Sequence, residues 1–476
     1  MMKYVMKPGR IRVASILSML LIILIPSQRV VFAQDLQPVG PIYIVQEGDT
    51  LWDIAQRFGV TLEDLARENS ISDPAELSAG DELIIPGIEG VNDVLVTRKV
   101  PLGENLRSLS RRFKLPEKSI IRLNHITSPV ELFNGYNLVV PASKQEGIPN
   151  ERLAMASGQS LFELAINQDV NPWALATNND LVGTWSAVPG DVLIIPDQES
   201  EDGPGGLPGE ISSLDAGVGP LTQGKLSVIR LEATEELVAG GSLAGNPLNF
   251  FHNGDGEYIA LQGIHALIEP GLHSLVLEGE LKNGVPFSFS QMLLVSAGDY
   301  TYKSLQVPPE TIDPANTKPE DEIWNALPKS ITPVKMWEGV FQSPVAPSPC
   351  GFTDTFGHRR SYNGSPYNYF HTGLDFCYNY NNEVNEIYAP ADGVVVFADS
   401  LVVRGNATLI DHGWGVYTGY MHQEEILVEV GEQVETGQVI GIVGQTGRVN
   451  GPHLHLEVWA GGVQVDPIDW LENPFP

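Results

Sequence analysis

The chain has 476 residues, a length that predicts three or four domains rather than one. Hydrophobic residues make up 42% of it, which is enough to build folded cores and argues against global disorder. The formal net charge of −31 argues against a nucleic-acid partner and against a polybasic membrane-binding surface, because both need clustered basic side chains.

The N-terminal residues have the pattern of a secretory signal peptide. A basic region within the first twelve residues precedes an almost continuous apolar run over 13–26, and residues 31–33 (VFA) form a small-residue cleavage site. The apolar run is short for a membrane-spanning helix, which needs about 20 residues. We therefore expect residues 1–33 to be a cleaved signal peptide and the mature protein to be exported. A membrane anchor is the alternative if cleavage does not occur.

The next region contains a sequence repeat with a period of 55 residues. Five sets of identical residues keep this spacing: Gly48, Gly103 and Gly158; Leu51, Leu106 and Leu161; Asn69, Asn124 and Asn179; Gly80, Gly135 and Gly190; Pro86, Pro141 and Pro196. Five positions in one register predict three copies of one small unit. We place the copies at residues 42–88, 94–143 and 150–198.

The first copy shows which elements the unit contains. Residues 43–45 predict a short strand, and Thr50 is a good N-cap for the amphipathic helix LWDIAQRF, which Gly59 ends. Thr61 caps a second helix, and residues 83–85 predict a returning strand. Each copy is therefore expected to be an α+β unit in the order strand, helix, helix, strand.

The first copy, from YIVQEGDTLWDIAQRFGVTLEDLARENSI to LSAGDELIIPG, closely resembles the LysM module. The resemblance implies binding to glycans that contain N-acetylglucosamine, such as peptidoglycan. The second and third copies match the pattern more weakly: residues 101–104 (PLGE) stand where the first copy has QEGD, and Gln168 replaces the phenylalanine that ends the first helix. These two divergent copies are either glycan-binding modules or structural spacers.

Three segments follow the repeats. Residues 199–220 are rich in Gly, Pro and acidic side chains and predict a linker. Over 221–308 the hydrophobic period changes to two, and short strands separated by turn residues predict a small antiparallel β-sandwich that acts as a spacer. Residues 309–337 predict a connector with one short helix at DEIWNAL. The chain is thus expected to be multidomain and mainly β.

The two cysteines, Cys350 and Cys377, both lie in the C-terminal part of the chain. An even number of cysteines in an exported protein predicts a disulfide, which would link the two here. Metal ligation is the alternative, because Cys377 lies two residues after Asp375.

The C-terminal segment, residues 338–476, carries the residues expected to do chemistry. Six of the ten histidines lie there. Two motifs concentrate them: His371-x-Gly-x-Asp375 and His453-Leu-His455. Because residues i and i+2 of a strand point to the same face, both histidines of the second motif can approach one site. One carboxylate and two imidazoles leave the fourth position of a tetrahedral zinc ion open, as catalytic zinc sites do. His422, in the strand-like stretch GVYTGYMH, is a further imidazole that can face this site.

The order of these motifs resembles the lysostaphin/LytM family of zinc peptidases. The match includes His371-x-Gly-x-Asp375, APADGVV, GNATLIDHGWGVYTGYMH and the stretch from VEVGEQVETGQVIG to GPHLHLEVW, over most of residues 345–470. The resemblance implies a β-rich LytM-type peptidase domain with His371, Asp375 and His455 as ligands of one Zn2+. It also implies His422 and His453 as catalytic residues. The preceding string YIALQGIHALIEPGLHSLVLEG resembles a β-sandwich found before the peptidase domain in some exported family members.

These observations predict a zinc metalloendopeptidase that hydrolyses peptide bonds of peptidoglycan and is anchored to wall glycan by its LysM-like modules. Its location would be extracellular or in the cell envelope. The alternative is a non-catalytic wall-binding regulator or activator of other cell-wall hydrolases. Outside the five motif residues, His412 and Tyr420 are expected to pack or orient a loop rather than to act in catalysis.

Overall fold

The computed structural model describes residues 40–476, except for 74, 76, 89–90, 92, 143–151, 196–205, 218, 348 and 383–384. The predicted signal peptide, residues 1–33, lies outside the described residues. Among the helices of the described part, none has the length and apolar character needed to span a membrane. The chain is mainly β, as the sequence predicts, and its helices are concentrated in the N-terminal repeats.

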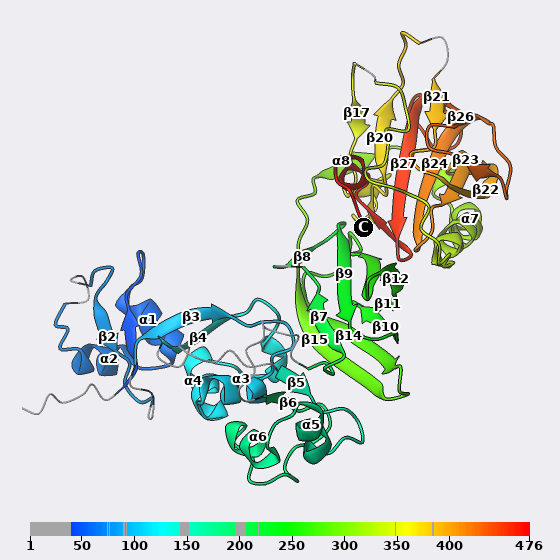
Figure 1. The fold of residues 1–476 in the computed structure, drawn as a ribbon. Helices are drawn as coiled ribbons and strands as arrows, with labels where there is room; N and C mark the ends of the chain where they lie inside the picture. Colours follow the sequence, from blue (N-terminus) through cyan, green and yellow to red (C-terminus); the bar gives the residue numbers. More distant parts are fainter. Residues whose placement is uncertain are drawn as a thin grey trace, which may run out of the picture. The chain divides into compact units, whose positions relative to one another are not determined.

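Each of the three repeats forms the predicted strand–helix–helix–strand unit (Figure 1). The two strands of each unit pair antiparallel. The first unit consists of β1 (Ile42–Ile44), α1 (Leu51–Phe58), α2 (Leu62–Glu68) and β2 (Glu82–Ile84). The second consists of β3 (Leu95–Lys99), α3 (Leu106–Phe113), α4 (Glu117–Asn124), the 3-10 turn Pro129–Glu131 and β4 (Asn137–Pro141). The third consists of β5 (Arg152–Ala154), α5 (Leu161–Asn167), α6 (Pro172–Asn178) and β6 (Val192–Ile194).

The asparagine that recurs every 55 residues forms hydrogen bonds with both the second helix and the second strand of its unit. In the first unit, the Asn69 amide donates to the Leu65 carbonyl at 2.9 Å and to the Ile84 carbonyl at 2.8 Å, and its Oδ1 accepts the Ile84 N–H at 2.6 Å. Asn124 and Asn179 make the same three contacts in their own units. This shared role gives a physical reason for the repeated asparagine.

The sandwich consists of a five-stranded sheet, in the order β11-β10-β14-β15-β8, and a four-stranded sheet, in the order β12-β13-β9-β7. All neighbours pair antiparallel except β15 and β8. Side chains along β15 alternate between buried and less buried positions, as expected for a strand with one face on a core. The strands are β7 (Ile211–Asp215), β8 (Leu221–Thr222), β9 (Leu226–Ala233), β10 (Leu237–Leu243), β11 (Asn246–Asn249), β12 (Phe251–Gly254), β13 (Glu257–Gly263), β14 (Gly271–Leu281) and β15 (Pro286–Ser296).

The structure differs from the expected segment boundaries at three places. Strand β7 lies within the stretch expected to be a linker, 199–220, but pairs with β9 of the sandwich and buries Ile211. Strand β16 (Tyr302–Leu305), expected to belong to the sandwich, pairs in parallel with β18 of the C-terminal domain. The connector holds a 13-residue helix, α7 (Pro314–Ala326), between the 3-10 turns Pro309–Thr311 and Leu327–Lys329. The alternating pattern of a strand identifies its buried face but not the strand with which it pairs. The sequence therefore could not show to which domain β7 and β16 belong.

The C-terminal domain is built on a sheet whose main path is β17-β20-β27-β24-β23-β22-β25. Strand β27 lies between β20 and β24, as Figure 1 shows. Its register places His455 opposite Asp375 of β20 and opposite Met421 of β24. The elements are β17 (Phe352–Asp354), β18 (Arg359–Tyr362), β19 (Tyr369–Phe370), β20 (Leu374–Cys377), β21 (Glu386–Tyr388), β22 (Gly393–Leu401), β23 (Gly405–Asp411), β24 (Val416–Ile426), β25 (Gln433–Val434), β26 (Val439–Val443), β27 (His453–Ala460), β28 (Val463–Val465) and α8 (Pro467–Glu472).

The predicted disulfide is confirmed: Cys350 and Cys377 are joined, which ties the end of β20 to the segment before β17. The alternative of Cys377 as a metal ligand is therefore wrong, because its sulfur is used in this bond.

Candidate metal centre and catalytic site

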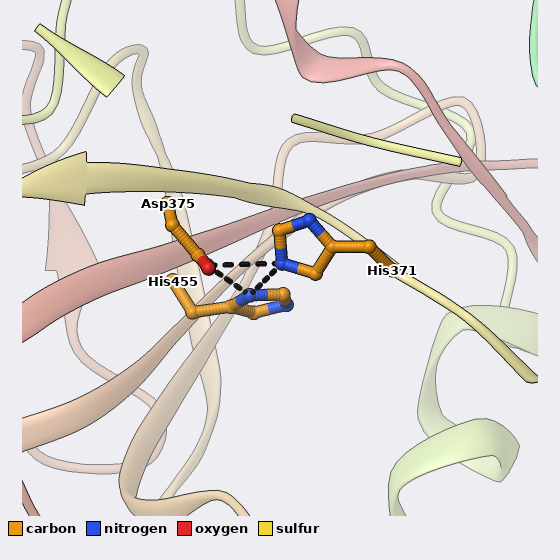
Figure 2. Close-up of side chains that lie close together, drawn as sticks. All are labelled: His371, Asp375 and His455. Carbon is orange, nitrogen blue, oxygen red and sulfur yellow. Dashed lines mark hydrogen bonds and ion pairs between the residues drawn. The ribbon is translucent and has the colours of Figure 1, made fainter. Parts of the chain in front are cut away.

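Three side chains from two strands and one loop converge at one point (Figure 2). His371 directly follows β19, Asp375 lies on β20 and His455 lies on β27. The His371 Nε2 atom is 3.0 Å from Asp375 Oδ1 and 3.0 Å from His455 Nδ1, and His455 Nδ1 is 2.7 Å from Asp375 Oδ1. The antiparallel pairing of β20 with β27 explains the convergence, because it places Asp375 and His455 opposite each other.

The donor atoms of this cluster fit a zinc ion. The His371 Nδ1 atom lies 2.7 Å from the Thr355 carbonyl, which can only accept, so this nitrogen carries the ring proton and Nε2 presents a lone pair. The His455 Nε2 atom faces the Thr372 hydroxyl at 3.3 Å and Glu457 Oε1 at 3.6 Å, so a neutral ring with its proton on Nε2 would present the lone pair of Nδ1 to the cluster. Two imidazole nitrogens and a carboxylate oxygen thus face one point. Zinc takes such ligands, and a second carboxylate that orients a ligand histidine is typical of zinc sites.

The electrostatics of the cluster also favour a cation. Asp375 is buried, but its contacts with His371 and His455 outweigh burial and hold the pKa of its carboxyl well below the usual range. Burial disfavours a charged His455, but the carboxylates of Asp375 and Glu457 outweigh burial and raise the pKa of His455 to about 9. Burial lowers the pKa of His371. The site therefore holds a carboxylate that stays ionised and attracts positive charge.

Glu457 is a member of the site that the sequence analysis missed. It is fully buried, and its contact with His455 outweighs burial and lowers its pKa to about 2. Its Oε2 accepts the indole N–H groups of Trp324 and Trp459, each at 2.9 Å, and its Oε1 accepts the Gln464 amide at 3.0 Å. The sequence contained a pattern that could have identified Glu457. His453, His455 and Glu457 occupy alternate positions of one strand and therefore share a face.

His422 and His453 lie beside the cluster of His371, Asp375 and His455. The ring centroids of His422 and His453 are 5.0 Å apart, and the His453 Nε2 atom is 3.7 Å from Asp375 Oδ1. Each ring uses Nδ1 to reach a carbonyl, Thr446 for His422 at 2.8 Å and Gly451 for His453 at 2.9 Å. Because a carbonyl only accepts, Nδ1 carries the proton in both rings and Nε2 is left with a lone pair.

The environment of His422 keeps this imidazole neutral. Burial, reinforced by the charges of His453 and His455, lowers its pKa to about 3. Its backbone has a φ of 66°, in the left-handed region that residues other than glycine rarely adopt. The His422 N–H donates to the Arg404 carbonyl at 2.9 Å. His422 is therefore held by its main chain as well as by its ring.

A cavity of about 340 Å³ opens beside His422 and His455. Helix α7 contributes Thr317, Asp321 and Asn325 to its wall, at a spacing of four residues along one helix face. A cavity of this size next to the histidines provides room for a peptide segment.

Two residues near the site pack as the sequence analysis expected. His412 is fully buried, with Nδ1 2.7 Å from the Asp392 carbonyl and Nε2 2.7 Å from Thr418 Oγ1. The Tyr420 hydroxyl lies 2.7 Å from the same Thr418 oxygen. These side chains form a buried hydrogen-bonded chain within the sheet.

Sequence comparison agrees with this geometry. The model described as peptidase family M23 matches residues 369–467, a range that contains all five predicted site residues. Residues 369–467 form a peptidase family M23 domain. The LysM domain model matches residues 43–86 and 99–141. The chain therefore combines LysM domains with a C-terminal M23 domain.

Curated relatives are similar to this chain over stretches of about 100 residues, and the solved structures cover from about a fifth to most of the chain. The peptidoglycan DD-endopeptidase ShyA of Vibrio cholerae is 42% identical over 98 residues, which are 21% of this chain and 22% of ShyA. The murein hydrolase activator EnvC of Escherichia coli is 39% identical over 90 residues, 19% of this chain and 22% of EnvC. A structure of the antimicrobial peptidase lysostaphin from Staphylococcus simulans is 30% identical, covers 21% of this chain and 44% of that one, and has a TM-score of 0.20. The chain thus matches less than a quarter of the length of these two curated relatives.

Proposed function

We propose that this protein is an exported zinc metalloendopeptidase that hydrolyses peptide bonds of peptidoglycan. The convergence of His371, Asp375 and His455 within hydrogen-bonding distance, with two further imidazoles beside them, carries the proposal. One Zn2+ would be held by Nε2 of His371, Oδ1 of Asp375 and Nδ1 of His455. When bound, it would supply a Lewis acid that polarises the scissile carbonyl.

The protein's own side chains supply the proton transfers of hydrolysis. The Nε2 lone pair of His422 or of His453 accepts a proton from the attacking water. The protonated imidazole then stabilises negative charge on the carbonyl oxygen or donates a proton to the leaving amine. The Glu457 carboxylate and the Thr372 hydroxyl favour a proton on Nε2 of His455, which leaves Nδ1 for the metal position.

The substrate is inferred from the combination of domains. LysM domains imply a wall glycan as a ligand, and ShyA is named for cleavage of peptidoglycan. We propose that the modules at 42–88, 94–143 and 150–198 hold the protein on the glycan, while the M23 domain cuts the peptides attached to it. Such tethering raises the effective concentration of the enzyme at an insoluble substrate.

A second function, activation of other cell-wall hydrolases, is favoured by the similarity to EnvC, whose name states that role. In that case the M23 domain would bind a partner enzyme and the five site residues would be dispensable. Their arrangement as three converging donors with two oriented histidines favours the peptidase.

The test is mass spectrometry of purified peptidoglycan digested by the full chain with zinc, compared with the variants His455→Ala and His453→Ala. We expect new peptide ends from the wild type, no new reducing sugar ends, and loss of at least 100-fold of the product in either variant. His453→Ala should keep its zinc and His455→Ala should lose it. Zinc binding without new peptide ends in the wild type would contradict the peptidase and leave activation as the function.

A further inference from the structure

Helix α7, expected from sequence to be part of a connector, is built into the M23 domain. Its Trp324 is fully buried and packs with Ala407, Leu409, Tyr417, Met421 and Trp459. The neighbouring face of the helix, which carries Thr317, Asp321 and Asn325, lines the cavity beside His422 and His455. Glu320 and Trp324 are four residues apart, so both project from the face that meets the domain.

Trp324 contacts the carboxylate behind the metal ligand His455. Its indole N–H donates to Glu457 Oε2 at 2.9 Å, and Glu457 Oε1 lies 3.6 Å from His455 Nε2. A buried carboxylate is costly unless hydrogen bonds satisfy its oxygens, and here the two indoles and Gln464 satisfy them. With Oε2 held by the indoles, Oε1 is directed toward His455.

The same helix also accepts hydrogen bonds from residues 403 and 404, which precede β23, and residue 404 contacts His422. Glu320 Oε2 accepts the Val403 N–H at 2.8 Å, and Glu320 Oε1 accepts the Arg404 N–H at 3.1 Å and its guanidinium at 2.7 Å. The Arg404 carbonyl in turn accepts the His422 N–H. Helix α7 is thus linked to two site residues. Trp324 is linked to His455 through Glu457, and Glu320 is linked to His422 through Arg404.

We propose that α7 is a positioning element of the metal centre and that Trp324 sets the orientation of His455 through Glu457. The inference rests on the proposed function insofar as the bound metal is zinc. Trp324 touches neither the metal position nor a substrate, so any effect on His455 passes through the residues that it contacts. Its ring also lies 5.3 Å from the Arg404 guanidinium, a contact that a phenylalanine ring can keep, so the N–H donor to Glu457 is the contact that the variant below removes. Removing the Trp324 N–H takes away one of the three donors that hold Glu457, so the carboxylate is held less firmly and His455 presents Nδ1 less reproducibly.

The test is the zinc affinity of the full chain, measured by competition with a chromophoric chelator, for the variant Trp324→Phe. This change keeps an aromatic ring and removes the donor. The matched control is Trp470→Phe, because Trp470 is equally buried but its Nε1 has no hydrogen-bond partner among the residues that the structure describes. We expect about tenfold weaker zinc binding in Trp324→Phe, the usual size of such an effect, and a change below twofold in Trp470→Phe.

A second variant covers the case in which Trp324→Phe does not fold. Glu457→Gln keeps the size of the side chain and removes its charge, and should weaken zinc binding by 10- to 100-fold. Equal zinc affinity in the wild type and in the folded variants would overturn the inference and leave the proposed function intact. A wild-type chain that binds no zinc would remove the proposed function and the inference together.

Discussion

Individual imidazoles in the C-terminal domain differ because their surroundings differ. The two carboxylates that face His455 raise its pKa to about 9, whereas burial lowers the pKa of His412 to about 4. His412 is packed against Phe341, and its two ring nitrogens are hydrogen-bonded to the Asp392 carbonyl and to the Thr418 hydroxyl. One side-chain type is thus held beside two carboxylates in one place and packed as a neutral core residue in another.

The buried neutral state of His412 predicts an acid-sensitive contribution to stability. Its folded pKa of about 4 lies below the unfolded value of about 6.5, so the unfolded chain binds the proton more tightly. The contribution is therefore complete above pH 6.5 and is lost as pH falls toward 4. Its upper size is about 3 kcal/mol.

We expect the difference in unfolding free energy between the wild type and His412→Gln to shrink between pH 7 and pH 4.5. Denaturant unfolding of both proteins across this range measures the difference. Val430→Ala, at an exposed position of the same domain and without a titratable group, is the control and should leave the wild-type slope with pH unchanged. A constant difference between the wild type and His412→Gln would show that His412 does not titrate in this window.

At the scale of elements, the same side-chain hydrogen bonds to the backbone recur in all three repeats. Thr50, Asn105 and Ser160 cap the first helix of their units, each accepting a backbone N–H three residues later. Asn69, Asn124 and Asn179 then tie the second helix to the second strand. The third unit therefore keeps the architecture of the first, although Gln168 replaces the phenylalanine that ends the first helix there.

The asparagine contacts predict that Asn179→Ala destabilises the third repeat locally. The change removes three hydrogen bonds and leaves the Ile194 N–H and carbonyl without these partners, at a cost of about 2 kcal/mol. Hydrogen exchange of the β6 amides in the full chain measures this loss. The neighbouring Asn178→Ala is the matched control, because that side chain makes only a long 3.4 Å contact to Ile194. Equal exchange in both variants would contradict the role of Asn179.

At the scale of the whole molecule, the sandwich packs against the M23 domain and is more than a spacer. Phe251 of the sandwich stacks on Trp414 with ring centroids 5.2 Å apart, within an apolar cluster shared by the two domains. Lys225 reaches Asp466 at 2.9 Å and Asp469 at 2.8 Å. The sandwich and the M23 domain therefore share a buried contact.

This contact predicts that the two domains unfold together. Phe251→Ala should remove about 3 kcal/mol of packing and split the calorimetric transition of the sandwich and M23 domain into two. Val238→Ala, on an exposed position of the sandwich, should leave the transition unchanged. A single unaltered transition in Phe251→Ala would mean that the contact does not couple the domains.

The sequence by itself determined the features that depend on local pattern or on side-chain chemistry. Periodicity identified the three repeats, and cap residues placed their helices. The H-x-G-x-D and H-x-H motifs selected His371, Asp375, His453 and His455 as candidates, with His422 beside them. The resemblance to known peptidases then predicted which of them bind the metal and which act in catalysis. Only the tertiary structure decided which distant segments meet. It paired β7 with the sandwich and β16 with the M23 domain, and it brought Trp324 from helix α7 to Glu457 behind His455. These contacts join residues far apart in the chain, and strand pairing and core packing leave no local pattern that names the partner.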